Sequence, residues 1–370
     1  MSAKKIVITG GAGFVGTNLI KYFLEKTKLN IISIDNYSSS SKKNHIRSSR
    51  VRYIKADTKN IGSVINPKKI HSVFHFGEFA RIYQSFLQMD KCIESNTIGT
   101  NAVINFCLKN KISLITANKA QLAEKSDLFF EGFDKKNLFL GFEAAVLGAV
   151  PVVQTTQQSI YPSKINAIYG IFNGTTNYII SKMYENKISF KETLEQAINN
   201  GFAEQDSSAD LSGRDAMHKL VLLSNISFGK KFKFSDMHYN GIENIKLIDL
   251  EQGLNLGYTL KLVSITERNR DKFFSSVAPC FVSDSSLIAK TNFEENVITF
   301  EGENFLKTSL VGKGAGGYPT ATSIISPESF TMMTPVSYTH LRAHETKANL
   351  VCRLRREKKK GGGGGGGGGG

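Results

Sequence analysis

The chain has 370 residues, of which 41% are hydrophobic, and its formal net charge is +15. This length is enough for two modest domains, each with a core of its own. The charge does not indicate a nucleic-acid-binding protein, because residues 335–370 alone hold eight Lys or Arg against two Glu. The remaining basic residues form no stripe interleaved with aromatic side chains.

The beginning of the chain and the cysteines suggest a compartment. Residues 1–5 lead straight into an apolar strand and then glycines, without the apolar core and cleavage site of a signal peptide. The four cysteines (Cys92, Cys107, Cys280 and Cys352) have no paired spacing, which suits a reducing compartment and does not indicate a zinc site. The longest apolar stretch, residues 142–153, is too short to span a bilayer. We therefore expect a cytoplasmic protein with neither membrane nor nucleic acid as a partner.

The first third of the chain opens with a pattern typical of dinucleotide binding. Residues 4–9 form an apolar run that predicts a buried parallel strand, and glycines and a helical pattern follow. Such glycines allow a tight turn and let the backbone approach a pyrophosphate at the helix N-terminus. The residues expected at the cofactor phosphates are Gly10, Gly13, Phe14, Val15 and Gly16. A turn that binds no phosphate is the alternative interpretation.

A second apolar run, residues 30–34, ends in Asp35. This is about the offset at which an acidic side chain meets the adenosine ribose hydroxyls of a dinucleotide. A carboxylate there accepts hydrogen bonds from the two hydroxyls and repels a 2′-phosphate. Asp35 therefore predicts NAD, with NADP as the alternative cofactor.

The sequence of this region resembles those of the extended short-chain dehydrogenases, especially the nucleotide-sugar epimerases and dehydratases. The resemblance rests on residues 9–16, 35–39, 51–57, 73–78 and 96–101, and it adds Asp57 to the expected cofactor contacts. It ends after about 110 residues. The family also needs a Ser or Thr after the fifth strand and a Tyr-x-x-x-Lys pair. Here Ala-Asn-Lys follows residues 112–116, and the pairs Tyr22/Lys26 and Tyr178/Lys182 lie inside other patterns, so both are interpreted as coincidental.

From residue 113 the motifs change. Lys119 follows the predicted strand 112–116, at the strand end where ligands of parallel sheets lie, although a surface lysine at a helix start fits the spacing equally well. Residues 142–151 predict a strand that runs into a loop of small residues. Residues 170–177 form a turn rich in hydroxyl and amide groups, suited to a polar ligand or to an ordinary turn.

A lysine and several carboxylates follow. Ser189 and Glu192 form a capping box that opens a helix, and Gly201 ends it. Asp215 and Lys219 share a helix face, which could be a surface ion pair worth about 0.3–0.5 kcal/mol. Lys219, however, adjoins two leucines of the next turn, at the edge of an apolar face. Carboxylates around such a lysine could bind an ammonium group and leave an amine for proton transfer.

This second series of motifs resembles homoserine dehydrogenase over residues 113–334. The matching segments read Thr-Ala-Asn-Lys-Ala, Glu-Ala-x-Val-x-Gly, Asn-Gly-Thr-Thr-Asn, Gly-Phe-Ala-Glu, Asp-Ala-x-x-Lys, Leu-Gly-Tyr-Thr-Leu-Lys-Leu and Gly-Lys-Gly-Ala-Gly-Gly-Tyr-Pro-Thr. The resemblance implies exchange of a hydride between NAD(P) and homoserine or aspartate 4-semialdehyde, in threonine and methionine biosynthesis. It also implies that Lys219 is the acid/base with Lys119 assisting.

Other roles follow from the same resemblance. The substrate-binding residues would be Glu204, Asp210, Asp215, Gly174 and Thr175, and the loop containing Gly312, Gly314 and Gly316 would close over the cofactor. Backbone oxygens around Glu143, Val146, Gly148 and Val150 would bind a monovalent cation, Na⁺ or K⁺. Leu147 and Ala149 stand where the family usually has smaller residues. The partners expected are a small-molecule substrate and a second copy of the chain in a homodimer.

The expected fold is α/β, a Rossmann-like doubly wound parallel sheet followed by an α+β catalytic domain. We expect a dinucleotide-binding domain over residues 1–149, a catalytic domain over 150–310 and a return to the first domain over 311–334. The join near 111–113 is either a natural fusion or an assembly chimera. Residues 336–346 resemble a translated sequencing adapter, so residues 335–370 are expected to be an artefactual, disordered tail. A nucleotide-sugar epimerase or dehydratase and a non-functional NAD-binding chimera are the competing interpretations.

Overall fold

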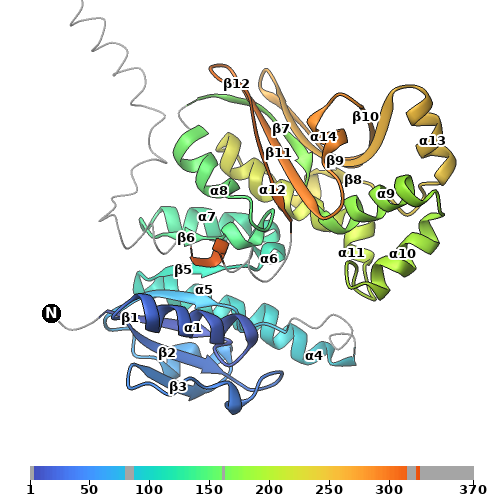
Figure 1. Cartoon of the computed structure of the whole chain (residues 1–370). Coiled ribbons are helices and arrows are strands. Elements are labelled where there is room, and N and C mark those ends of the chain that lie inside the picture. The colour runs from blue at the N-terminus through green and yellow to red at the C-terminus, as the bar shows by residue number, and fades with distance from the viewer. Residues whose placement is uncertain (1–3, 80–86, 161–162, 315–321, 326–370) are drawn as a thin grey trace, which may run out of the picture.

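The computed structural model describes residues 4–79, 87–160, 163–314 and 322–325, which form two domains stacked one above the other (Figure 1). The first domain contains a parallel sheet in the order β3-β2-β1-β4-β5-β6. Its strands are β1 (Lys5–Thr9), β2 (Asn30–Asp35), β3 (Val51–Lys55), β4 (Ile70–His75), β5 (Ser113–Thr116) and β6 (Leu140–Gly141). Its helices are α1 (Phe14–Lys26), α2 (Ile61–Val64), α4 (Met89–Cys92), α5 (Thr100–Asn110), α6 (Lys119–Glu124) and α7 (Ser126–Asp134), with a π-helix at Ile93–Gly99.

Both faces of this sheet are buried, as its apolar runs predict. Ile6 and Ile8 of β1 point to the α1 side and pack with Leu19 and Phe23. Val7 points to the opposite side and joins the core that includes Val103 of α5. Alternate residues of one strand therefore enter two different cores. The doubly wound α/β sheet predicted from the sequence is confirmed.

The expectation for residues 142–151 is wrong. β6 ends at Gly141, and Glu143–Ala145 form a 3₁₀ turn instead of a strand. The carboxylate of Glu143 accepts hydrogen bonds from the backbone N–H groups of Val153 and Gln154, both at 2.8 Å. These are donors of the first turn of α8 (Val152–Thr155), so the acidic side chain folds the segment back onto the next helix.

The second domain is a mixed sheet in the order β12-β11-β7-β9-β10-β8 with helices packed against it. Its strands are β7 (Ile165–Ile171), β8 (His238–Tyr239), β9 (Tyr258–Asn269), β10 (Lys272–Ser283), β11 (Glu295–Gly302) and β12 (Leu306–Lys313). Its helices, beside α8, are α9 (Gly174–Asn186), α10 (Phe190–Asn199), α11 (Ser208–Leu211), α12 (Arg214–Phe228), α13 (Leu247–Asn255) and α14 (Leu287–Lys290). The capping box of Ser189 and Glu192 opens α10 as predicted, and Gly201 follows with φ +76°.

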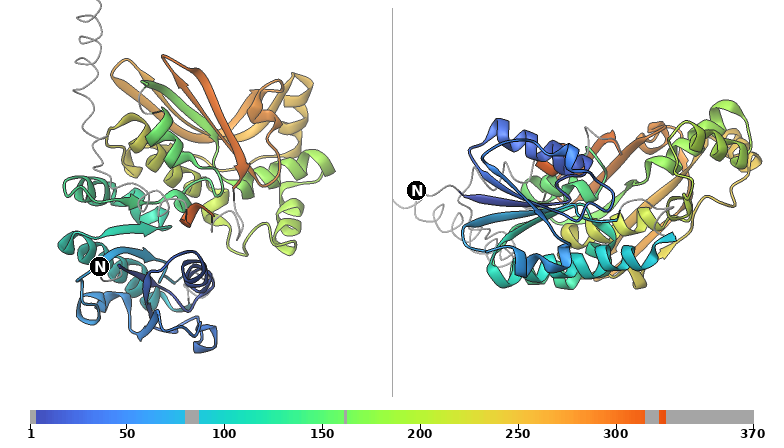
Figure 2. Two further views of the ribbon diagram at one scale, coloured as in Figure 1. Left: turned by 60° about the vertical axis from the view of Figure 1, so that its left-hand side comes forward. Right: turned by 90° about the horizontal axis from the view of Figure 1, so that it is seen from below.

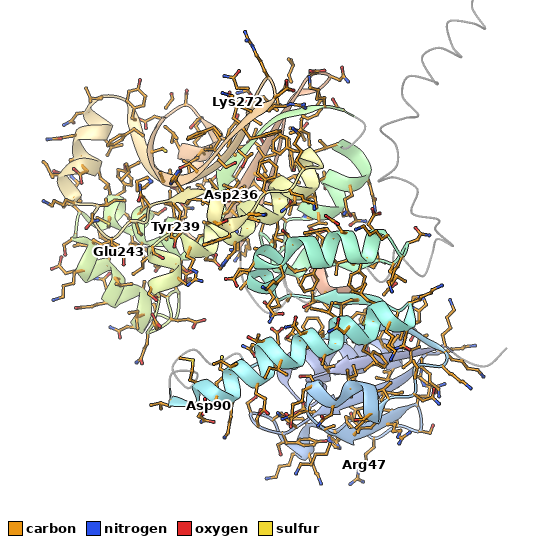
Figure 3. All side chains as sticks on the ribbon, turned by 180° about the vertical axis from the view of Figure 1, so that it is seen from behind. Arg47, Asp90, Asp236, Tyr239, Glu243 and Lys272 are labelled. Atoms are coloured by element: carbon orange, nitrogen blue, oxygen red, sulfur yellow. The ribbon has the colours of Figure 1, made fainter. Side chains whose placement is uncertain are left out.

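The helix α12 links the domains, because it packs on both β9 of the second sheet and α6 of the first domain. Seen from below, the first domain lies to the left and the second domain extends past it to the right (Figure 2). Arg47 and Lys272 mark the opposite ends of the molecule in the view from behind (Figure 3). Among the described residues, no helix combines the length and apolar character needed to cross a bilayer.

The return to the first domain begins later than residue 311. β12 continues to Lys313 and pairs with β11 along its whole length, so residues 311–313 belong to the second sheet. The strand persists because each of its residues has a ladder partner, Lys313 opposite Glu295. Residues 322–325 lie against the first domain, where Ile324 packs with Ile6 and Ile20. The expected tail, residues 335–370, lies outside the described residues.

Candidate active site

The carboxylate of Asp215 and the ammonium group of Lys219 form a buried ion pair on α12. Their residues are 5% and 8% exposed, and Lys219 Nζ lies 2.8 Å from Asp215 Oδ2. Lys219 also donates to the backbone carbonyl of Phe172 at 2.7 Å. The surface ion pair that the spacing alone allowed is therefore not what forms. An ion pair with so little solvent depends on hydrogen bonds to all its partners.

A second lysine reaches the same carboxylate from the other domain. Lys119, at the start of α6, pairs with Asp215 Oδ1. Burial by itself would raise the pKa of Asp215, but the charges of Lys219 and Lys119 outweigh it and hold that pKa far below its usual range. Desolvation lowers the pKa of Lys119, while Asp215, Asp210 and Glu204 together raise it above its ordinary value. Lys119 thus lines the crevice, with 40% of its side chain still exposed.

Asn173 completes the cluster, although the sequence analysis assigned no separate role to it. Its side-chain amide donates to Asp210 Oδ1 at 2.7 Å and to Asp215 Oδ2 at 2.9 Å. Its Oδ1 accepts from the backbone N–H of Thr176 at 2.8 Å and so caps α9. The available signal was the Asn before Gly-Thr-Thr, a typical helix N-cap, but the long-range amide contacts had no signal in the sequence.

These groups line one side of a cavity of about 530 Å³ between the domains. Gly174, Thr175 and Glu204 line it as well, so the structure brings all the expected substrate-binding residues and both lysines together. Desolvation raises the pKa of Glu204, and Asp210 adds to this effect. Desolvation also raises the pKa of Asp210, and the negative charge of Asp215 raises it further. The cavity therefore combines positive ammonium groups with carboxyl groups that readily pair with another cation.

The segment that leads to Glu294 at the cavity is held by a buried lysine to which the sequence analysis assigned no role. Lys261 of β9 is fully buried and donates to Asn177 Oδ1, to the Thr291 carbonyl and to Asn292 Oδ1 at 2.7–3.0 Å. Desolvation lowers the pKa of Lys261 to about 8. These bonds join β9 to α9 and to the segment before Glu294, which lines the cavity. A lysine in a strand rich in leucine gives no sequence signal for such a role.

The Tyr-x-x-x-Lys pairs do not form a catalytic arrangement. Tyr178 is buried and its ring stacks on Phe202 with centroids 4.1 Å apart. Lys182 instead pairs with Glu185 at the surface, at 2.6 Å. In the other pair, both residues lie on α1. The structure gives neither pair the surroundings of an epimerase site.

The glycine loop lies between the end of β1 and the start of α1. Gly10 has φ +68°, and a Cβ there would lie 2.6 Å from the Phe76 carbonyl oxygen. A Cβ at Gly16 would overlap the Gly10 carbonyl oxygen, so only glycine allows α1 to approach the strand so closely. Gly13 caps α1 without a side chain, which leaves the N–H groups at Phe14 and Val15 directed out of the helix end. This cradle fits the phosphates of a dinucleotide.

Asp35 is buried at the end of β2 beside this loop. One of its carboxylate oxygens accepts from Ala12 N at 2.9 Å, and the other accepts from Tyr37 N and Ser40 Oγ at 2.8 Å. Asp57 follows β3, and its Oδ1 accepts from the Asn36 side chain at 2.6 Å. Both acidic residues thus lie at the carboxyl edge of the sheet, where the sequence places the cofactor.

The later glycines have separate positions. Gly312 lies within β12 against Val150, whereas Gly314 follows the strand, lines the cavity and donates its N–H to the Glu294 carbonyl at 3.0 Å. No contact joins Gly312 or Gly314 to the loop at residues 10–16. Gly316 lies outside the described residues.

The expected cation loop is a compact turn beside the cavity. Val146 and Val150 are buried, Leu147 has φ +49° and Gly148 has φ +59°. The Gly148 carbonyl accepts from Ser323 Oγ at 2.7 Å. Burial raises the pKa of Glu143, although backbone N–H groups of α8 partly offset this effect. The carboxylate of Glu143 is turned to the start of α8.

Two family models match the chain. Residues 151–327 match the homoserine dehydrogenase model, and residues 6–126 match the model of the NAD dependent epimerase/dehydratase family. The two-part resemblance seen in the sequence is therefore confirmed.

Homoserine dehydrogenases are also similar over the second part in pairwise comparison. The enzyme of Neisseria gonorrhoeae is 32% identical over 229 residues, which are 62% of this chain and 52% of the relative. That of Helicobacter pylori is 35% identical over 219 residues, 59% of this chain and 52% of the relative. The chain thus spans about half the length of the curated relatives it matches.

Solved structures resemble nearly the whole chain. A homoserine dehydrogenase from Thiobacillus denitrificans superposes with a TM-score of 0.76 and 23% identity over 92% of this chain and 77% of that one. One from S. aureus has a TM-score of 0.71 and 25% identity over 90% and 76%. The fold, including the first domain, is therefore shared even where the sequence resembles another family.

Proposed function

We propose that this chain is an NAD(P)-dependent oxidoreductase that interconverts L-homoserine and L-aspartate 4-semialdehyde. The observation that supports this proposal most strongly is the charged cluster of Lys119, Asp215 and Lys219, which come from two domains and meet in one cavity. The relatives named homoserine dehydrogenase match through the segment that supplies Asp215 and Lys219. The reaction places it in the biosynthesis of threonine and methionine.

The lysines manage one proton in this proposal. In reduction of the aldehyde, the ammonium group of Lys219 donates the proton that the substrate oxygen takes up, and in oxidation the amine form of Lys219 accepts that proton at Nζ, while Lys119 holds the oxygen in place. The carboxylate of Asp215 keeps both ammonium groups at the cavity. Glu204, Asp210 and Asp215 bind the ammonium group of the amino acid, with Gly174 and Thr175 shaping the pocket around it. The small cavity and its acidic wall suit a charged small molecule.

The cofactor binds at the glycine cradle in this proposal. NAD supplies the hydride acceptor when it is bound, or the hydride donor in the reverse direction. Backbone N–H groups from Phe14 to Gly16 hold its phosphates, and Asp35 accepts from the ribose hydroxyls. Support comes from the close approach at Gly10 and from the carboxylates at the strand ends. Gly314 lies at the cavity, where it can cover the reacting end.

A monovalent cation at residues 143–150 is a further part of the proposal. Buried Glu143 has lone pairs left beyond its two backbone hydrogen bonds, and a nearby cation would offset its burial. Thermal unfolding in KCl against choline chloride at equal ionic strength tests this, and a higher melting temperature in KCl is expected. Equal melting temperatures would contradict the cation site.

We also propose a homodimer. The second sheet leaves large apolar side chains exposed on one face of its strands, including Phe274 of β10 and Val311 of β12. Burying them against a second copy would remove this surface from water. Sedimentation velocity should give twice the monomer mass, and Phe274→Glu should shift it toward the monomer. A wild-type monomer at micromolar concentration would contradict the dimer.

The activity test follows NADH formation from homoserine and NAD by its absorbance. Homoserine-dependent NADH formation is expected, and it should be lost in Asp215→Asn at low homoserine and partly restored at high homoserine. A protein that binds NADH by fluorescence but forms none from homoserine would be a non-functional NAD-binding chimera. Turnover of a nucleotide sugar without homoserine turnover would support the epimerase interpretation instead.

A further inference from the structure

A chain of buried hydrogen bonds crosses the carboxyl edge of the first sheet. Thr9 Oγ1 accepts from the backbone N–H groups of Phe76 and Gly77 at 3.1 and 3.0 Å. Both of its lone pairs are therefore used, and its hydroxyl hydrogen is donated to His75 Nδ1 at 2.7 Å. Burial lowers the pKa of His75 to about 4, so the imidazole is neutral and carries its hydrogen on Nε2.

The chain continues in one direction. His75 Nε2–H donates to Thr100 Oγ1 at 2.9 Å, and the Thr100 hydroxyl donates to Glu78 Oε1 at 3.1 Å. The same oxygen accepts from the side-chain amide of Asn118 at 2.6 Å. Each donor is matched to one acceptor, and the chain ends at the carboxyl group of Glu78. This side chain is 21% exposed, and its burial raises its pKa to about 7.

Asn118 is the residue immediately before Lys119. Its Oδ1 accepts from Gln121 N at 3.1 Å and so caps α6, while its amide points to Glu78. Asn118 is thus fixed from both sides, by the helix it caps and by the loop after β4. A second bond across the same interface runs from the Gln121 side chain to the Asn96 carbonyl, in the π-helix.

The contact between Glu78 and Asn118 joins the two parts of the chain that resemble different families. Thr9, His75, Glu78 and Thr100 precede residue 111, whereas Asn118 belongs to the Thr-Ala-Asn-Lys-Ala motif that resembles homoserine dehydrogenase. Lys119 can meet Asp215 only if α6 starts at the right place and direction. A shift of the cap by an ångström would move the ammonium group by a similar distance.

We propose that Glu78 is a positioning residue for Lys119, acting through the amide of Asn118 across the interface of the two parts. This rests on the proposed role of Lys119 in the reaction. The carboxyl oxygen of Glu78 holds the side chain of Asn118, which caps α6. The position of this cap determines where α6 starts, and the start of α6 places the ammonium group of Lys119 against Asp215. Glu78 itself does not line the cavity in which Lys119 lies.

The first test is independent of turnover. Lys119 is acetylated with limiting acetic anhydride, and its rate is read by peptide mass spectrometry relative to Lys182 and Lys307 of the same chain. In Glu78→Ala the contact with Asp215 loosens and the pKa of Lys119 falls, because Asp215 no longer raises it as strongly, so we expect a rate about three to ten times higher. Glu78→Gln keeps an acceptor oxygen and should stay within about twofold of the wild type.

The second test asks whether Glu78 acts through Asn118. Asn118→Ala should raise acetylation of Lys119 by itself, and adding Glu78→Ala should then have no further effect. If Glu78→Ala does not fold, Glu78→Asp provides the same comparison, because it withdraws the carboxylate by one methylene. Equal acetylation in wild type and Glu78→Ala, or additive effects in the double variant, would overturn the proposal.

Kinetics separate this proposal from the proposed function. If homoserine turnover is present, Glu78→Ala should lower kcat by about tenfold with little change in KM, because Lys119 acts on the reacting oxygen. Glu78→Gln should restore most of kcat. If the wild type has no turnover, the proposed function fails, while the acetylation rates still decide whether Glu78 positions Lys119.

Discussion

The two domains contribute different kinds of chemical groups to the candidate site. The first uses backbone, where glycines bring α1 against β1 and N–H groups at the helix end point toward the expected phosphates. The second uses buried charged side chains, where Asp215 and Lys219 depend on Asn173 and on a lysine of the other domain. The backbone site needs glycine at Gly10 and Gly16 but no particular charge, whereas removal of one partner from a buried charge cluster changes the charge that the remaining groups must balance.

The difference also separates local from distant partners. The glycine loop and Asp35 lie within 26 residues of each other in the sequence, and their contacts follow from one strand-turn-helix-strand unit. Lys119, Asn173 and Asp215 are far apart in the sequence, and only docking of α12 on α6 brings them together. Substitutions in the second cluster are therefore expected to have the larger effects.

The largest expected effect is that of Lys219→Ala. Loss of the proposed acid/base should lower kcat by roughly 10²–10⁴, while Lys119 still neutralises Asp215 and keeps the protein folded. Affinity for NADH should not change, because the cofactor phosphates lie at the other domain's glycine loop. Steady-state kinetics and NADH fluorescence titration measure both, with Lys182→Ala of a surface pair as the control. A kcat within threefold of the wild type would end the proposed role.

Lys261→Met should be the most destabilising change outside the charge cluster. It removes a fully buried ammonium group and leaves three oxygen acceptors without their donor. The expected loss is about 3 kcal/mol of unfolding free energy, measured by urea denaturation. Lys290 is an exposed lysine of the adjoining helix α14, and Lys290→Met should change the unfolding free energy by less than about 0.5 kcal/mol. Similar values for both variants would show that Lys261 does not hold the cavity wall.

In the first domain, His75 and Glu78 should give opposite pH dependences of stability. Between pH 4 and 6.5 the unfolded chain holds a proton on His75 that the folded chain does not, so stability rises with pH. Between pH 4.5 and 7 the folded chain keeps the proton of Glu78, so stability falls with pH.

Each effect amounts to about 3 kcal/mol across its window, and in the wild type they largely cancel. Glu78→Gln should therefore reveal a rise in stability between pH 4.5 and 6.5, and His75→Gln should reveal a fall. Urea denaturation of the three proteins across this pH range measures the slopes. Parallel slopes in all three would contradict the assignment of these groups.

The smallest effect concerns the choice of cofactor. The carboxylate of Asp35 should repel a 2′-phosphate and favour NADH over NADPH by about tenfold, or about 1.4 kcal/mol. Asp35→Asn keeps the hydrogen bond from Ala12 N and should reduce the tenfold preference for NADH over NADPH. Fluorescence titration of both cofactors measures it. Equal or tighter NADPH binding by the wild type would refute the preference.

The sequence predictions that the structure confirms are those that rest on short-period apolar patterns and on local motifs. The apolar run at residues 4–9, the capping box at Ser189 and the shared face of Asp215 and Lys219 appear in the structure as the sequence predicts. Residues 142–151 did not, because an apolar run with small residues fits a turn as well as a strand. There the long-range contact of Glu143 with α8 decided the outcome.

The sequence by itself determined the two sets of motifs, the glycine cradle and the residue types of the charge cluster. Period and spacing depend only on neighbours along the chain, so they can be read without coordinates. Only the tertiary structure decided that Lys219 is buried, that Asn173 bonds two carboxylates and that Lys261 and Glu78 support the site. Burial and hydrogen-bond partners depend on which segments pack together, and residues 30 or more positions apart leave no periodic signal of their contact.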